Sequence, residues 1–198
     1  MPPVTTALIV ANVAIYFLQQ LLPGLVGPFA LWPIAAGQMS GGQVSWQPWQ
    51  LVTYAFLHGG ITHLLFNMFA LYMFGGAIEQ VVGAKRYLNY YFVCVITAAL
   101  AQLATSALAG GLYPTVGASG GVFGLLLAYA VFFPRNRVML LFPPIPMPAR
   151  VFVIVYAVLE LVLGVTGTQE GVAHFAHLGG LVGGAAMLYY WRHFGRRR

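Results

Sequence analysis

The chain of 198 residues is 60% hydrophobic and only 6% charged, with a mean hydropathy of +0.82. This composition excludes a soluble globular domain and indicates an all-α polytopic membrane protein, whose solvent is the lipid bilayer. The formal net charge of +6 comes from basic residues that flank apolar runs, so it predicts membrane topology and no nucleic-acid partner.

Basic clusters divide the chain into apolar segments that are each too long for one membrane crossing and suit two crossings joined by a turn. No charged residue precedes Glu79, and the basic residues then fall within 85–86, 135–150 and 192–198. We therefore predict a single domain, residues 1–198, with a long outer first loop at 23–60. Its six membrane-spanning helices are expected at 4–22, 61–82, 87–109, 119–134, 151–167 and 172–191.

The predicted hairpins place all basic residues at one membrane face, which the positive-inside rule assigns to the cytoplasm. Both termini are expected at that face, and the loops at 23–60, 110–118 and 168–171 at the other. The start of the chain has no basic n-region and no clear small-residue cleavage site. Residues 4–22 are therefore expected to be a retained span and not a cleavable signal peptide.

A serine and a histidine within the spans are predicted at the same depth. Ser119 lies 16 residues before Arg135 and His177 lies 15 residues before Arg192, which is about 22 to 24 Å of helical rise in both cases. Polar groups at such depth are costly and usually have a partner or a function. A hydroxyl and an imidazole at one level have the arrangement that a Ser–His nucleophile needs.

Small residues beside these two predict that the fourth and sixth spans approach closely. The helix-packing positions are Gly117, Gly120, Gly124, Gly180 and Gly184. The segment 117–120 is open to a second interpretation, as a helix-packing motif without chemistry. The position of Ser119 at a helix start favours catalysis, because free backbone N–H groups and the helix dipole stabilise an oxyanion there.

His63 and Asn67 are spaced i and i+4 on one face near the outer end of the second span. The Asn67 amide donates hydrogen bonds without changing its protonation state, which suits an oxyanion-binding group. Alternatively, both side chains simply bind loop carbonyls at the helix end. The residues alone leave these two interpretations open.

The acidic residues of the chain are Glu79, Glu160 and Glu170. The sequence places none of them clearly beside His177, so no orienting acid is predicted for that imidazole. Glu79 is expected to pair with the basic residues at 85–86. Helical rise places Glu160 near mid-membrane, where a carboxylate is neutral or hydrogen-bonded, and it is assigned no catalytic role.

Three motifs occur on spans two, four and six. They are His63-Leu64-Leu65-Phe66-Asn67, Gly117-Ala118-Ser119-Gly120 and Ala176-His177-Leu178-Gly179-Gly180. In this order they resemble the rhomboid family of intramembrane serine proteases, and the resemblance extends over nearly the whole chain. It implies the minimal six-helix bacterial type of this fold.

The resemblance also implies site residues. The nucleophile would be Ser119 and the general base His177, with oxyanion donors at His63, Asn67 and the Ser119 backbone. Phe123 would stack on the base, at a position where many relatives have tyrosine. Where many relatives have Trp-Arg, the first loop has Trp49-Gln50, which affects its anchoring at the headgroups and not the dyad.

The implied activity is cleavage of transmembrane segments of membrane proteins near the outer face, in a bacterial inner membrane. The expected partners are these substrates and the bilayer. No cofactor and no metal are expected. The Gly-rich segment 164–168 is predicted to be a loop that gates substrate access.

Three other functions remain open. The first is a catalytically inactive relative that binds membrane clients. The second is a metalloprotease using His58, His63, His174 and His177, which the lack of a His-Glu-x-x-His motif and of a nearby carboxylate ligand disfavours. The third is a transporter or channel, for which Glu160 is the single deep acid.

Overall fold

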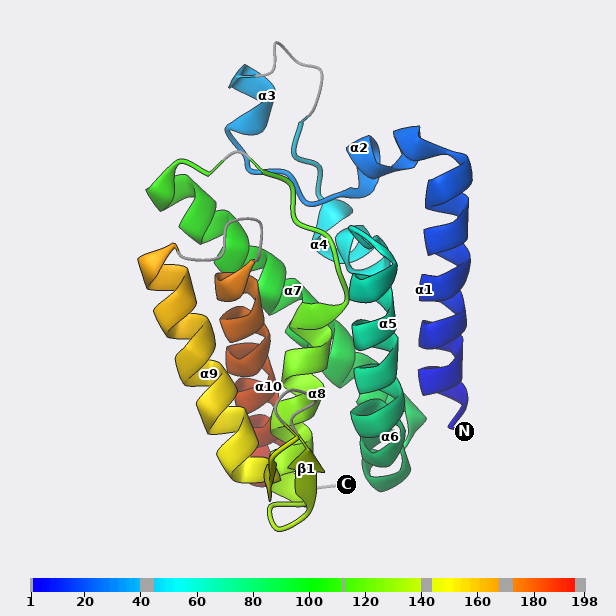
Figure 1. The fold of residues 1–198 in the computed structure, drawn as a ribbon, viewed down its shortest axis with the longest axis vertical. Coiled ribbons are helices and arrows are strands. Elements are labelled where there is room, and N and C mark those ends of the chain that lie inside the picture. Colours follow the sequence, from blue (N-terminus) through cyan, green and yellow to red (C-terminus); the bar gives the residue numbers. More distant parts are fainter. Residues whose placement is uncertain (1, 40–44, 112, 140–143, 168–172, 195–198) are drawn as a thin grey trace.

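The structure is a computed structural model that describes residues 2–39, 45–111, 113–139, 144–167 and 173–194. Six long helices run side by side within these ranges (Figure 1). The predicted all-α polytopic bundle is confirmed, and each helix begins and ends within three residues of its expected span. The long helices are α1 (Pro3–Leu21), α5 (Ile61–Ala70) continued through a π-helical turn (Leu71–Gly75) into α6 (Gly76–Val82), α7 (Ala84–Ala109), α8 (Ser119–Phe132), α9 (Ala149–Thr166) and α10 (His174–Phe194).

The first loop contains short helices: 3₁₀ turns at Pro23–Leu25 and Tyr54–Phe56, and α2 (Val26–Phe29), α3 (Ala36–Met39) and α4 (Gln50–Thr53). It is bonded to the segment that precedes α8. Leu31 and Thr115 exchange two backbone hydrogen bonds of 3.0 and 2.9 Å, and the Gly117 N–H donates to the Tyr54 carbonyl at 2.9 Å. Protein groups therefore satisfy these irregular stretches, as non-helical backbone within a membrane requires.

A small antiparallel hairpin joins α8 to α9 at the opposite end of the bundle (Figure 1). Its strands are β1 (Arg137–Met139) and β2 (Pro146–Pro148), and Val138 pairs with Met147. The sequence analysis did not predict this hairpin, because the basic residues at 135–150 indicate a loop between two helices and not its secondary structure.

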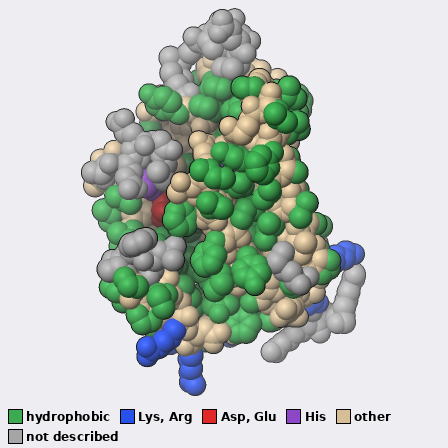
Figure 2. Space-filling model, turned by 45° about the vertical axis from the view of Figure 1, so that its right-hand side comes forward, with side chains coloured by type: hydrophobic (Ala, Val, Ile, Leu, Met, Phe, Trp, Pro, Cys, Tyr) green, Lys and Arg blue, Asp and Glu red, His purple; other side chains and the backbone are tan. Residues whose placement is uncertain are grey.

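Four described helices are long and apolar enough to cross a membrane: α1, the Ile61–Val82 helix, α7 and α9. Helix α8 has only 14 residues, about 21 Å of rise, and is shorter than a bilayer core of about 30 Å. Glycines, histidines and a terminal Tyr-Tyr-Trp-Arg lower the hydropathy of α10. Hydrophobic side chains cover much of the face that Figure 2 shows, and the Lys and Arg side chains visible there lie toward its lower end. The protein is an integral membrane protein.

Helix α8 packs against α7 and α10 through small residues. A Cβ atom at Gly180 would collide with the Gly120 carbonyl, and one at Gly184 would lie 3.3 Å from the Gly124 Cα. These glycines let the α8 and α10 backbones touch, which sets the distance between the side chains at the N-terminal ends of the two helices.

Glu79 does not pair with basic residues 85–86, and that prediction is wrong. Its carboxylate is 4% exposed and accepts hydrogen bonds from the N–H of Val4 at 2.9 Å and from the N–H and hydroxyl of Thr5, both at 2.7 Å. These donors lie in the first turn of α1, where backbone N–H groups lack helical acceptors and the dipole favours an anion. Glu79 therefore caps α1 and joins it to α6.

Candidate active site

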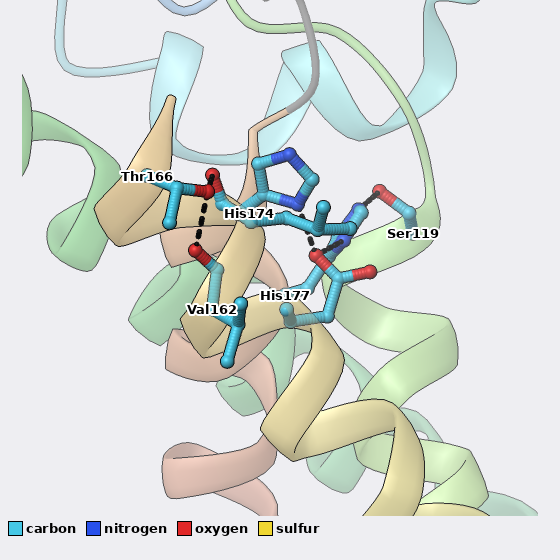
Figure 3. A network of polar contacts seen from close by, with 7 residues as sticks. Ser119, Val162, Thr166, His174 and His177 are labelled. Carbon is cyan, nitrogen blue, oxygen red and sulfur yellow. Dashed lines mark hydrogen bonds and ion pairs between the residues drawn. The ribbon is translucent and has the colours of Figure 1, made fainter. Parts of the chain in front are cut away.

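Ser119 and His177 lie together near the N-terminal ends of α8 and α10. The His177 Nε2 atom is 2.8 Å from the Ser119 Oγ atom (Figure 3). Ser119 is the first residue of α8, whose first backbone hydrogen bond joins the Val122 N–H to the Ala118 carbonyl at 3.0 Å. The N–H of Ser119 therefore has no acceptor within the helix and lies beside its own hydroxyl.

Phe123 lies one turn after Ser119 and covers one face of the His177 ring. The ring centroids are 4.3 Å apart and the planes differ by 6°. Phe123 in turn contacts Tyr156 of α9, with centroids 6.3 Å apart. This packing restricts rotation of the imidazole about its χ2 angle.

An acid lies beside His177, contrary to the prediction. The Oε2 atom of Glu160 is 2.6 Å from Nδ1 of His174 and 3.0 Å from Nδ1 of His177 (Figure 3). His174 begins α10 and shares a helical face with His177, whereas Glu160 comes from α9. The sequence could have indicated this contact, because a carboxylate within the membrane is costly and requires a polar partner.

Glu160, His174 and His177 are also residue types that ligate metals, and their ligand atoms all lie within 4.8 Å of one another. The reasoning that no carboxylate lies near these histidines is therefore wrong. The separations of 2.6 and 3.0 Å from the carboxylate oxygen to the imidazole nitrogens are hydrogen-bond lengths. Two ligands of one tetrahedral zinc, with bonds of about 2.0–2.1 Å, would lie about 3.3 Å apart. The arrangement fits N–H donors on a carboxylate.

The His63 ring lies against Gly117, on the side of Ser119. The Gly59 N–H points at Nδ1 of His63 at 3.4 Å, a long contact that favours the tautomer with its proton on Nε2. A Cβ atom at Gly117 would lie 2.8 Å from that Nε2 and 3.7 Å from the Ser119 Oγ. The Ser119 hydroxyl and the Nε2 atom of His63, a predicted oxyanion donor, therefore border one small space.

Gly117 does not belong to the helix-packing stripe, and that prediction is wrong. It lies before α8 with φ = +127°, a conformation that residues with a Cβ rarely adopt. The missing side chain leaves room for the His63 ring.

Asn67 is 5% exposed, and its Nδ2 donates to the His63 carbonyl at 2.9 Å. One amide hydrogen therefore binds a carbonyl of its own helix, and not the loop carbonyl that the alternative interpretation expected. The amide has a second hydrogen to donate.

The predicted gating loop at 164–168 is in part helical. Residues 164–166 belong to α9, which is capped by Gly167, and residue 168 lies outside the described residues. The Gly164 backbone packs on α10, since a Cβ atom there would lie 3.1 Å from the Cβ of His174. Described residues 164–167 therefore form the C-terminal end of α9 and its cap, and they do not form a loop that is detached from the bundle.

Residues 45–194 match the Rhomboid domain. The chain belongs to the rhomboid family. It is 31% identical over 184 residues to rhomboid protease GluP of Bacillus subtilis, covering 92% of this chain and 34% of that protein. It is 32% identical over 142 residues to the mitochondrial rhomboid protein 1 of Saccharomyces cerevisiae, and this match covers 69% of this chain and 39% of that protein. It is 27% identical over 202 residues to rhomboid protease GlpG of Klebsiella pneumoniae, and this match covers 99% of this chain and 66% of that protein. The chain spans about a third of GluP and two thirds of GlpG.

Proposed function

We propose that this rhomboid-family protein is a serine endopeptidase that cleaves transmembrane segments within the membrane. The observation that carries the proposal is the 2.8 Å contact between the Ser119 hydroxyl and Nε2 of His177. A hydroxyl at a helix start, paired with an imidazole, has the parts of an acyl-transfer nucleophile. The names of GluP and GlpG as rhomboid proteases agree with this activity.

Acylation begins when Nε2 of His177 takes the proton from the Ser119 hydroxyl. The serine oxygen attacks the carbonyl carbon of the scissile peptide bond and forms a tetrahedral oxyanion. The imidazolium then gives its proton to the leaving nitrogen, the C–N bond breaks, and an ester joins the N-terminal fragment to Ser119. A water molecule repeats these steps, with His177 again as base, and releases a carboxylic acid and free serine.

The oxyanion requires donors that are in place before it forms. We assign this function to the Ser119 N–H, to Nε2 of His63 and to the second amide hydrogen of Asn67. The space beside Gly117 supports the first two assignments, because His63 Nε2 and the Ser119 hydroxyl both border it. The Asn67 assignment rests on its position one turn from His63.

We further propose that substrates are cleaved near the outer face of a bacterial inner membrane, with both termini of this protein in the cytoplasm. The basic residues gather at the end of the bundle opposite the first loop (Figure 2), which supports this orientation through the positive-inside rule. A transmembrane substrate must unwind locally, since a helical peptide bond is hydrogen-bonded and sterically covered.

The test uses the purified protein in liposomes with a fluorogenic transmembrane substrate, and a fluorophosphonate label mapped by mass spectrometry. We expect the label on Ser119, and loss of cleavage in Ser119→Ala and His177→Ala. A label at another residue, or full cleavage by either variant, would disprove the dyad.

The same preparation separates the other functions. An inactive client-binding protein would retain the substrate segment without cleaving it. A metalloprotease would lose cleavage with a chelator, and a transporter would show solute flux in Ser119→Ala liposomes.

A further inference from the structure

Glu160 is a buried acid of α9 that the two-residue mechanism does not use. Its side chain is 11% exposed, and its carboxylate lies beside the imidazoles of His174 and His177 on α10. An ionised carboxylate in a membrane bundle needs hydrogen-bond donors close by. The donors that the structure brings to it are Nδ1 of His174 and Nδ1 of His177, on the same oxygen.

The tautomer of His177 follows from its proposed role as the base for Ser119. To take the serine proton, Nε2 must be free of hydrogen, so the neutral ring carries its proton on Nδ1. The Nδ1 atom is the one that lies 3.0 Å from the Glu160 carboxylate. A carboxylate that accepts the Nδ1 hydrogen selects the tautomer that can act as a base.

We propose that Glu160 is the positioning residue of the catalytic histidine, and that His174 holds the Glu160 carboxylate in place. This inference rests on the proposed function, because it acts through the Ser119–His177 pair. Glu160 does not touch substrate. It orients the His177 ring from the Nδ1 side, while Phe123 restrains the ring face.

His174 secures the carboxylate because its contact is the shorter of the two. Its Nδ1 hydrogen bond of 2.6 Å to Oε2 is of the charge-assisted length, and its side chain is 5% exposed. The 3.0 Å contact to His177 lies outside the angular range of a hydrogen bond in this conformation. The proposal requires a small rotation of the His177 imidazole to align this contact, a motion that leaves the bond between Glu160 and His174 in place.

The acylation step then includes a defined electrostatic contribution. When His177 takes the serine proton, the ring becomes an imidazolium beside an anion, in a bundle where charges interact more strongly than in water. The attraction grows as the proton moves, so it stabilises the transition state more than the ground state. The proton on Nδ1 stays on the ring.

The experiment measures kcat and KM in liposomes for Glu160→Gln, Glu160→Asp and His174→Ala. We expect Glu160→Gln to lower kcat on the order of 100-fold with little change in KM, because the lost interaction forms in the transition state. Glu160→Asp keeps the charge and should recover a large part of that loss. His174→Ala should lower kcat less, on the order of 10-fold, since the direct contact to His177 remains.

The matched control is Glu79→Gln, the same substitution at the other described acid. It should leave kcat per folded protein unchanged, because Glu79 caps α1. A kcat for Glu160→Gln within about twofold of the original protein, while the fluorophosphonate still labels Ser119, would overturn this inference and leave the dyad standing. Equal loss in Glu160→Asp and Glu160→Gln, together with an equal fall in thermal stability, would also overturn it. Loss of activity with a chelator and its return with Zn²⁺ would show a metal in the cluster and replace the hydrogen-bond assignment.

Discussion

Two buried glutamates at different ends of the bundle show how differently a membrane protein accommodates an acid. Glu79 is 4% exposed and Glu160 is 9% exposed. Glu79 binds backbone N–H groups and a hydroxyl at the start of α1. Glu160 is hydrogen-bonded to the imidazole of His174 and lies 3.0 Å from that of His177, which contacts the Ser119 hydroxyl.

The difference lies in what the partners can do. Backbone amides and a threonine hydroxyl do not change protonation near neutral pH, so the donors on Glu79 form a permanent cap. An imidazole gains and loses a proton in this range, so in the proposed mechanism the His177 ring beside Glu160 changes charge. Burial marks both acids as important, and the identity of the partner separates a structural acid from one beside a reaction site.

The largest effect on activity is expected at the candidate active site, where Glu160 lies. Ser119→Ala should lower cleavage by on the order of 10⁴-fold or more, because the nucleophile is lost. Its free energy of unfolding should change by less than about 0.5 kcal/mol, as only one hydroxyl is removed. Substrate cleavage in liposomes and thermal unfolding in detergent measure the two quantities. Ser106→Ala on α7 is the matched control and should retain activity.

A methyl group added between α8 and α10 should disturb the candidate active site and leave the hydrogen bonds of Glu79 to α1 unchanged. Gly180→Ala places its Cβ on the Gly120 carbonyl, and such overpacking costs about 1–3 kcal/mol. We expect a lower unfolding temperature and reduced cleavage, since the helix separation sets the Ser119–His177 distance. Gly27→Ala, where no atom lies within 4 Å of the new Cβ, is the control. Unchanged cleavage by Gly180→Ala would show that the glycine contact does not position the dyad.

Loss of the α1 cap should affect stability alone. Thr5→Val removes the hydroxyl that donates to Glu79 at 2.7 Å and should lower the free energy of unfolding by about 1–2 kcal/mol. Because the same hydrogen bond is already weakened in Glu79→Gln, the effects of the two substitutions should not add. A double-mutant cycle of unfolding in detergent tests this, with kcat per folded protein constant throughout. Additive losses would show that the two side chains act independently.

The smallest expected effect concerns His58 in the first loop. Burial, together with the neighbouring His63, lowers the pKa of His58 from its ordinary value of 6.5 to about 4. The folded state therefore binds fewer protons than the unfolded state between these values, so His58 contributes stability above about pH 6.5 that is lost as the pH falls toward 4. We expect the unfolding temperature to fall by a few degrees over this range. His58→Gln should make that decline shallower; an unchanged pH dependence would assign it to other groups.

The sequence by itself predicted six long helices with ends within three residues of those in the structure, and it predicted that Ser119 and His177 lie at one level. These features depend on local quantities, namely the length of apolar runs, the position of basic residues and the rise of a helix. The glycines at 120, 124, 180 and 184 also indicated which helices touch. Small residues are informative because they permit close contact of two backbones.

Only the tertiary structure decided what lies beside His177 and beside Glu79. Glu160 reaches His177 from another helix, and Glu79 meets donors 74 and 75 positions away in the chain. Such contacts depend on how each helix is rotated about its axis and on its tilt. In a bilayer these are set by packing against neighbouring helices, because both sides of a helix are apolar and hydrophobicity does not distinguish lipid from protein.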